Sequence, residues 1–516
     1  MGRMTESRTR KSIRNSATAI FFFAIQFILG FYSRKIFLDR LGTEILGLNT
    51  TATNILQFLN LAELGISAAI TFSLYKPLHD NDTTKINELI TLQGKFYRRV
   101  AMMIIAGAII VMMFFPVIFH KTRLPLWYAY ASFSVLLYSQ LLGYFVNYRQ
   151  IALTAAQKDY KVQASVGTTN LLKILSQIVA LSLSNYPYQW WLALEILFST
   201  LSCIVLNITI KRTFGFLRKS QMTYVELKDK YSSILKKTKQ VFFHSIAGFV
   251  LTQSSPLIIY AYSSLTIVAI YGNYLIITSG LQRMTVSFFQ GMSAGVGDLI
   301  AERNYKHIRE VFFQLFSLRF LVSAWVAFSM LILSKPFISL WIGNQYLLPL
   351  STVGIISATL FIMLNRNTVG MFLYGFGQYQ DIWSPIIEAT LNIGLSILLG
   401  YYFGLNGIIS GVLISLILVV EIWKPYFLFT WGLKERASLY FSNYLAHLGI
   451  AAIVGTTIWI LSRPFTEDII NSRLGLIVFG ISTSGTFLIL TGLIMYIIFP
   501  NFRIVMKAPF HKIFKS

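Results

Sequence analysis

Charged residues are scarce in this chain of 516 residues, because Asp, Glu, Lys and Arg together make up only 12% of it. Soluble domains carry about 25%. Hydrophobic residues make up 55% and the mean hydropathy is +0.62. The composition excludes an ordinary water-soluble protein and predicts an all-α polytopic membrane protein.

The chain also lacks the residues of several kinds of catalytic or metal site. Its single cysteine, Cys203, excludes an internal disulfide framework and a thiolate cluster. The six histidines never fall at metal-ligand spacing, and no GxxxxGK[ST] phosphate loop is present. We therefore expect no bound metal, no resident cofactor and no ATP hydrolysis by such a loop.

Acidic residues are few, so the 44 Lys and Arg against 20 Asp and Glu leave a net charge of +24. In a soluble chain this would suggest nucleic acid. Cytoplasmic loops of membrane proteins are normally basic, and we therefore exclude nucleic acid as the partner.

Fourteen apolar runs are long enough to cross a membrane, which takes about 20 residues. The first follows a basic N-terminal stretch and is too long for a signal-peptide core, so it is kept as a helix. The predicted spans are 16 to 38, 46 to 73, 98 to 119, 126 to 148, 164 to 184, 190 to 210, 241 to 262, 266 to 297, 311 to 334, 349 to 374, 382 to 403, 406 to 423, 443 to 462 and 474 to 499.

The distribution of basic residues orients these spans. An even number of spans places both termini on one side, and most of the Lys and Arg fall in loops of that side. Both termini are therefore predicted to be cytoplasmic. No outer loop exceeds about 20 residues, too few for an external catalytic domain. The longest inner connection, 211 to 240, is expected to be a solvated basic linker facing anionic lipid head groups.

An internal repeat suggests two similar halves. Gly65 to Ala69 (GISAA) resembles Gly291 to Gly295 (GMSAG) at an offset of 226 residues. Six spans separate the copies, so both cross in the same direction, as in parallel transporter repeats. The predicted domains are an N-terminal lobe of six spans (1–215), a basic linker (216–240), a C-terminal lobe of six spans (241–435), and a final pair with a tail (436–516).

Polar residues at helical spacing mark one face of several predicted spans, and such a face needs water or protein beside it. Span two shows the clearest pattern. We expect these stripes to line a hydrated cleft between the lobes, although helix packing through small residues would fit span seven nearly as well. The stripe residues are Gln26, Asn49, Thr53, Gln57, Asn60, Ser67, His244, Thr252 and Asn273.

Ionisable residues at membrane depth are the sharper signal, since each costs about 2.5 to 3.5 kcal/mol near a helix centre on insertion scales. The predicted anion-binding cations are Arg34, Lys35, Lys173, Arg283, Arg319 and Arg366. Snorkelling of Arg34 and Lys35, or structural pairing of the others, stays open. The carboxylates Glu63, Glu195 and Glu388 could carry a coupling H⁺, with partnership to an intramembrane arginine as the favoured alternative.

The first hundred residues resemble the Wzx-type oligosaccharide-lipid flippases of the multidrug/oligosaccharidyl-lipid/polysaccharide exporter superfamily. The resembling stretches are Arg34 to Leu38 (RKIFL) with Arg40 to Gly42 (RLG), Leu46 to Asn49 (LGLN), Leu61 to Gly65 (LAELG) and Tyr75 to Leu78 (YKPL). The resemblance implies two six-helix lobes, a V-shaped cavity and alternating access. It also implies movement of an undecaprenyl-pyrophosphate-linked sugar repeat to the outer leaflet. In the related lipid II flippases the last two helices form a groove for the lipid tail, and spans thirteen and fourteen are expected to do so here. Apart from H⁺ or Na⁺ as a coupling ion, we expect no cofactor.

The likeness to the related lipid II flippases is partial. Arg34 matches their first-helix cavity arginine, and Glu63 lies at the position of their Ala-Glu-Gly stretch, whereas their second-helix arginine has no counterpart. Their eighth-helix arginine falls near Leu275, about two turns before Arg283. This departure argues against a peptidoglycan precursor as cargo.

The sequence thus predicts a non-enzymatic lipid-linked oligosaccharide flippase of a bacterial cytoplasmic membrane, working with glycosyltransferases and a polymerase of one surface-polysaccharide pathway. A multidrug exporter of the same fold is the nearest alternative, although organic cations would favour acidic cavity walls. A membrane polymerase or glycosyltransferase is the alternative from another class, and it would usually need a large outer loop.

Overall fold

The computed structural model describes residues 8–63, 66–232, 250, 253–289, 292–377, 383–465 and 472–507. Throughout these ranges the secondary structure is helical, and they contain no strand. The chain divides into two compact units, residues 1–249 with 264–269 and residues 250–263 with 270–516. The domain boundaries expected from the sequence stay a prediction.

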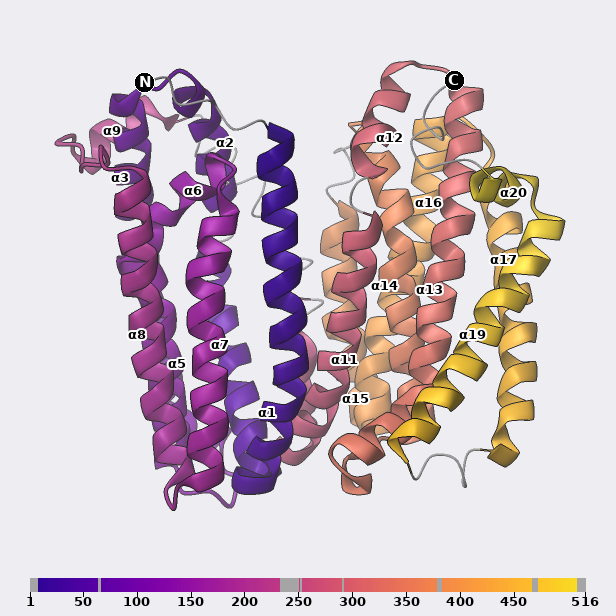
Figure 1. Ribbon diagram of the computed structural model, residues 1–516, viewed down its shortest axis with the longest axis horizontal. Coiled ribbons are helices and arrows are strands. Elements are labelled where there is room, and N and C mark those ends of the chain that lie inside the picture. The colour runs from indigo at the N-terminus through magenta and orange to yellow at the C-terminus, as the bar shows by residue number, and fades with distance from the viewer. Residues whose placement is uncertain are drawn as a thin grey trace. The chain divides into compact units, whose positions relative to one another are not determined.

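Unit 1 is a helical bundle in which α7 packs along α1 and α8, and α5 packs against α1, α3 and α8 (Figure 1). Its elements are α1 (Arg8–Leu59), the 3₁₀ turn η1 (Asn60–Glu63), α2 (Ile66–His79), α3 (Thr83–Met113), α4 (Phe115–Ile118), α5 (Trp127–Phe145), the 3₁₀ turn η2 (Asn147–Gln150), α6 (Ile151–Ala155), α7 (Asp159–Leu183), α8 (Pro187–Thr213) and α9 (Tyr224–Lys230).

Unit 2 begins with helical residues 253–262 and continues through α11, whose first five residues belong to unit 1. Its elements are α11 (Leu265–Phe289), α12 (Met292–Ala301), α13 (Tyr305–Trp341), η3 (Asn344–Tyr346), α14 (Leu350–Gly375), α15 (Trp383–Leu416), the π-helix η4 (Ile417–Trp423), α16 (Lys424–Phe427), the π-helix η5 (Leu428–Leu433), α17 (Ala437–Ser462), η6 (Arg463–Phe465), α19 (Arg473–Ile498) and α20 (Pro500–Lys507).

The core of unit 2 is aromatic. The ring of Phe312 in α13 lies 5.1 Å from Phe372 in α14 and 5.2 Å from Phe429 in η5, edge to face in both cases. Tyr440 of α17 packs on Phe316 at 5.4 Å. These buried contacts join α14, η5 and α17 to α13, the most buried helix among the candidate spans of the described residues (Figure 1).

Ten helices in the described residues are long and apolar enough to cross a membrane, or eleven if the bent pair Trp127–Phe145 and Asn147–Ala155 forms one span. Two of them, Arg14–Leu59 and Trp383–Leu433, contain 46 and 51 residues. At 1.5 Å per residue each would extend about 70 Å, against a hydrocarbon core of about 30 Å. Each therefore provides two crossings. Of the predicted span 241 to 262, only residues 250 and 253–262 are among the described residues.

A glycine marks the bend in each of these long helices. Gly42 in α1 has φ 80° and ψ 173°, and Gly404 in α15 has φ 55° and ψ −134°. Residues with a Cβ adopt such positive φ values rarely, whereas glycine does so freely. Beyond Gly404 the chain folds back closely, since a Cβ on Gly407 would lie 1.9 Å from the carbonyl oxygen of Leu399.

The second predicted span, 46 to 73, is not one continuous helix. The α1 helix ends at Leu59, the tight turn η1 covers Asn60–Glu63, and α2 begins at Ile66. The sequence pattern concealed this break because a 3₁₀ turn also aligns residues three apart. The third predicted span was too short, since α3 begins at Thr83 rather than at 98.

The N-terminal part of α3 binds the segment that follows α8, residues 218–222. Asn87, Thr91 and Lys95 lie four residues apart on α3, and their side chains bond to backbone groups of residues 218–222 at 2.6 to 2.9 Å. The predicted solvated linker is therefore docked over this stretch. The residue after α8, Phe214, is buried as well.

A short helix, α9, completes this docking. Thr223 and Glu226 form a capping box at its start, which satisfies two backbone N–H groups reciprocally. Leu227 is fully buried, and Lys230 pairs with Glu88 of α3 at 2.8 Å. The prediction of a solvated linker was therefore wrong for α9. A capping box and one apolar residue are weak sequence signals in a segment that is otherwise rich in lysine.

Candidate substrate-binding and coupling sites

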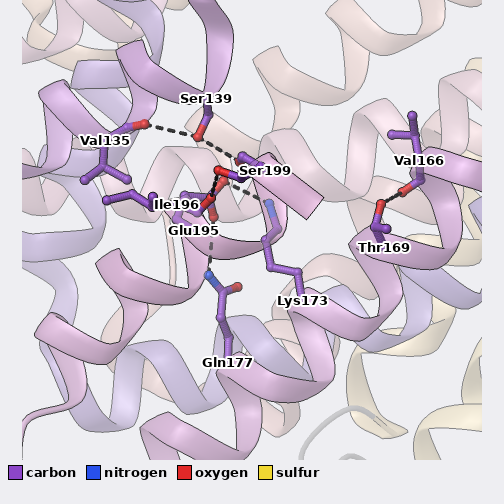
Figure 2. A network of polar contacts seen from close by, with 10 residues as sticks. Val135, Ser139, Val166, Thr169, Lys173, Gln177, Glu195, Ile196 and Ser199 are labelled. Carbon is purple, nitrogen blue, oxygen red and sulfur yellow. Dashed lines mark hydrogen bonds and ion pairs between the residues drawn. The ribbon is translucent and has the colours of Figure 1, made fainter. Parts of the chain in front are cut away.

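Lys173 of α7 is neutralised inside unit 1. Its Nζ lies 2.9 Å from Oε1 of Glu195 in α8, and Gln177 donates to the other carboxylate oxygen at 3.3 Å. Figure 2 shows the three side chains converging between α7 and α8. One helical turn along α8, Ser199 donates to Ser139 of α5 at 2.8 Å. The contacts match the alternative in which Lys173 has a structural partner.

Glu388 of α15 binds two cations in unit 2. Arg366 of α14 approaches Oε1 at 3.5 Å, and Lys424 of α16 approaches Oε2 at 3.4 Å. The Glu388 side chain is only 2% exposed, whereas the two cations are 27% and 19% exposed. Lys424 was not among the predicted residues because it follows the end assigned to span twelve.

Glu63 is held by neutral donors. The hydroxyl of Tyr144 in α5 donates to its Oε2 at 2.5 Å, Tyr97 of α3 donates to Oε1, and Ser67 of α2 donates to Oε1 at 3.3 Å. No Lys or Arg forms an ion pair with this carboxylate in the part of unit 1 that the structure describes.

The same cluster holds Asn60, whose Oδ1 accepts from Tyr144 at 2.8 Å and from Gln140 of α5. Gln93 of α3 donates to Ser67 at 3.4 Å. The cluster therefore ties the break between α1 and α2 to α3 and α5. The sequence analysis missed Tyr97 and Tyr144. From sequence alone, a tyrosine that bonds to a buried carboxylate cannot be distinguished from one of the tyrosines that are common at the membrane–water interface.

A fourth intramembrane carboxylate, Glu421 in η4, was also missed. It is 6% exposed, and Asn365, Tyr444 and Arg366 are its polar neighbours. It lies two residues before the predicted end of span twelve, and the sequence analysis did not consider it. Arg366, which pairs with Glu388, is thus a neighbour of Glu421 as well.

Arg319 of α13 is 4% exposed and lies over the ring of Phe289 at 4.3 Å. Its Nη2 approaches the sulfur of Met371 at 3.9 Å. No acidic side chain forms an ion pair with it among the described residues. Cation–π contact and a soft acceptor thus take the place of a carboxylate.

The other predicted cations lie nearer to the surface of their units. Arg34 is partly exposed and engaged in a polar or electrostatic interaction, Lys35 is exposed, and Arg283 of α11 is exposed. In the described ranges neither Lys35 nor Arg283 has an acidic partner. Whether these cations bind an anion stays a prediction.

The predicted stripe residues have mixed surroundings. Gln26 donates to the carbonyl of Gly167 in α7 at 3.3 Å, so it packs against a neighbouring helix. Asn49 is buried and accepts from Ser132 of α5 at 2.5 Å. Thr53 is exposed and bonds to its own helix.

Of the remaining stripe residues, Gln57 is partly exposed and Asn273 of α11 is fully buried. His244 and Thr252 lie outside the described residues. The role of the whole stripe as a cavity lining stays a prediction.

A groove runs between the last two long helices of unit 2. It has a volume of about 340 Å³ and a mostly apolar wall. The residues that line it are Ile458, Leu461, Ser462, Val478, Phe479, Ser482, Thr483 and Thr486 of α17 and α19.

The architecture is one found among membrane transporters. Two solved structures of multidrug resistance MATE family transporters of the MOP superfamily, one inward-facing and one outward-facing, align with TM-scores of 0.57 and 0.53 at 14% identity. They cover 79% and 80% of this chain and 96% and 93% of their own chains. No family model and no curated protein sequence matches the chain.

A third solved structure resembles the chain over nearly all of its length. The lipid II flippase MurJ, in an inward closed conformation, aligns with a TM-score of 0.66 at 15% identity, over 94% of this chain and 99% of that one. The chain is therefore an all-α polytopic membrane protein with a MurJ-like and MATE-like fold. At these identities the likeness concerns the fold and not the cargo.

Proposed function

We propose that the chain is a flippase that moves undecaprenyl-pyrophosphate-linked oligosaccharide repeat units from the cytoplasmic to the outer leaflet. One observation carries the proposal: bases in the spanning helices outnumber the carboxylates that neutralise them. Lys35, Arg283 and Arg319 have no acidic partner in the described part of the chain. Unpaired cations at membrane depth suit a pyrophosphate group, and Arg in particular can bind two of its oxygens.

The groove between α17 and α19 supports a lipid-borne cargo. Its apolar wall suits an isoprenoid chain, while the sugars would need the polar side chains elsewhere. In this proposal the last helix pair holds the tail during alternating access. The same groove gives a small organic cation, the cargo of a multidrug exporter, no electrostatic attraction, because it contains no acidic residue.

Glu63 is the best candidate for a coupling site. Its carboxylate has neutral hydroxyl donors, so gaining a proton would leave no cation unpaired. We infer that it binds the coupling H⁺ in preference to Glu195 and Glu388, which hold cations. The cytoplasmic membrane of a bacterium, with both termini inside, is the proposed location, and glycosyltransferases and a polymerase of the same pathway are the proposed partners.

Replacing Arg34 and Arg283 together with Ala tests the function. We expect loss of surface polysaccharide, measured in cells at equal protein level, and accumulation of the lipid-linked precursor on the inner side. The matched control replaces the exposed Lys306 and Lys335 with Ala, which removes the same charge elsewhere. Normal polysaccharide in the double arginine variant would refute the role of the cations.

A further inference from the structure

The surface of unit 1 contains a basic pocket that the proposed transport does not use. It lies where α3, α8, the end of α5 and the turn η2 meet the segment after α8, and its volume is about 460 Å³. Four basic side chains line it, namely Arg98, Arg149, Lys211 and Lys219. By the positive-inside pattern of the sequence, this is the cytoplasmic end of the unit.

The four bases have no acidic counterpart. No ion pair joins any of them to Asp or Glu in the described residues, and no acidic residue is among those that line the pocket. Arg98, Lys211 and Lys219 are exposed, and Arg149 is partly exposed. Mutual repulsion of four cations around one pocket is unfavourable unless an anion is bound among them.

The rest of the wall is apolar and open. Phe145 and Val146 at the end of α5 and Ile204 and Ile208 on α8 are all exposed and line the same pocket. In a membrane-spanning helix, exposed apolar side chains of this kind face acyl chains. The pocket thus combines positively charged side chains, which can bind an anionic head group, with exposed apolar side chains, which can contact acyl chains.

The polar floor of the pocket is held in place by neighbouring contacts. Asn207 of α8 donates to Asn147 of η2 at 3.0 Å. Arg149 donates through Nε to the hydroxyl of Tyr148 at 3.3 Å, which leaves its terminal N–H groups available. Tyr148 in turn lies against Gly94 of α3, where an added Cβ would be 2.7 Å from the ring.

We propose that this pocket binds the head group of an anionic glycerophospholipid of the cytoplasmic leaflet, with its acyl chains along Phe145, Ile204 and Ile208. Basic pockets between spanning helices on the cytoplasmic side bind such phosphate-bearing head groups. The lipid would tie α3, η2 and α8 to the segment that holds α9. This lipid is resident, so the inference does not depend on the nature of the cargo.

The test uses the full-length chain in phosphatidylcholine nanodiscs that contain a trace of spin-labelled phosphatidylglycerol or, separately, spin-labelled phosphatidylcholine with the same acyl chains. We expect more motionally restricted phosphatidylglycerol than phosphatidylcholine on the native chain. Replacing the four pocket bases with Gln should reduce this preference by about fivefold or more, since each base contributes to attraction of the anionic lipid. Equal restriction of the two labels on the native chain would overturn the proposal.

A matched control removes four basic side chains from the same end of unit 1 but outside the pocket. All four are exposed, and the set is Lys76, Arg212, Arg218 and Lys228, each replaced by Gln. This variant should keep the phosphatidylglycerol preference. An equal loss in both fourfold variants would show a diffuse charge effect and overturn the pocket assignment.

Two further measurements keep the result interpretable. If the fourfold pocket variant fails to fold, Lys211→Gln with Lys219→Gln changes only exposed side chains and should still lower the preference, and an unchanged preference would overturn the proposal. Inorganic phosphate and pyrophosphate at millimolar concentration should leave the restricted phosphatidylglycerol in place. Complete displacement by either would assign the pocket to a free phosphate and overturn the lipid assignment.

Discussion

At the scale of single residues, the carboxylates in the spanning helices differ in what neutralises them. Glu195 has a lysine, Glu388 has an arginine and a lysine, and Glu63 has two tyrosines and a serine. A proton on Glu195 or Glu388 would leave a partly buried cation without its partner, which is costly. A proton on Glu63 would only change the direction of hydrogen bonds.

This difference gives a prediction for proton coupling. We expect Glu63→Gln to flatten the pH dependence of flipping, measured with purified chain in proteoliposomes between about pH 5.5 and about pH 8, because the amide cannot exchange a proton. Glu195→Gln should leave the shape of the pH profile unchanged. Identical profiles for native protein and Glu63→Gln would exclude Glu63 as the proton carrier.

The pair Lys173 and Glu195 predicts a non-additive effect on stability. Replacing Lys173 alone with Met leaves a carboxylate buried without its cation, at a cost of about 3 to 5 kcal/mol. Replacing both residues with Met should restore most of the loss, and the melting temperatures of the purified variants provide the measurement. Equal losses for the single and double variants would show that the ion pair adds nothing specific.

At the scale of elements, the bend in α15 makes a prediction from backbone geometry. Gly407→Ala places a Cβ 1.9 Å from the Leu399 carbonyl oxygen, and neither backbone can move without breaking its helix. We expect a melting temperature lower by several degrees or loss of folded protein. Gly394→Ala in the same helix is the control, since a Cβ added there would meet no neighbouring atom within 4 Å and alanine favours a helix. Similar behaviour of both variants would contradict the close approach.

The docked helix α9 gives a prediction for pH. Hydrogen bonds from the backbone N–H and side chain of Thr223 lower the pKa of Glu226 below its ordinary value. The capping box is therefore fully effective above the ordinary glutamate pKa and is lost as the pH falls through the lowered value. Amide hydrogen exchange of residues 224–230, corrected for its intrinsic rate, should increase in acid.

Two variants of Thr223 provide the control for this prediction. Thr223→Ala should increase exchange of α9 already at neutral pH, because loss of the cap costs about 1 kcal/mol, whereas Thr223→Ser should not. Exchange that is independent of pH and of both substitutions would show that the buried Leu227 alone holds the helix.

The elements were predictable to different degrees. Length and apolarity identified the chain as a bundle of membrane-spanning helices, because both are properties of local sequence, but they missed the break inside span two and the true start of α3. The break at Asn60 and the docking of residues 218–222 on Asn87, Thr91 and Lys95 depend on partners over 20 residues away, which no local pattern contains. The partner of Lys173 also lies on another helix, so the sequence left open whether Lys173 forms an ion pair or lines a cavity. Glu421 was missed for the same reason.

At the scale of the whole molecule, the fold resembles both a lipid II flippase and multidrug resistance transporters, so transport must be measured with a lipid-linked and with a drug-like cargo. We expect proteoliposomes with the native chain to flip a fluorescent polyprenyl-pyrophosphate oligosaccharide and not to accumulate an organic-cation dye, because its intramembrane charge excess is positive. Protein-free liposomes and the variant Arg34→Ala with Arg283→Ala are the controls. Dye accumulation without oligosaccharide flipping would favour the multidrug exporter.

The two π-helices in unit 2 have a consequence for how this molecule tolerates changes in length. Each turn of η4 and η5 holds nearly one residue more than an α-helical turn, since its N–H bonds reach five residues back. Deleting a residue from an α-helix rotates all that follows by about 100°. Deleting one residue from η4 would instead return the segment to α geometry and leave the helix beyond it nearly in phase, because the π turns had taken up that extra residue. Lys424, which directly follows η4, would then still face Glu388, so the pair tolerates the loss of one residue at this place.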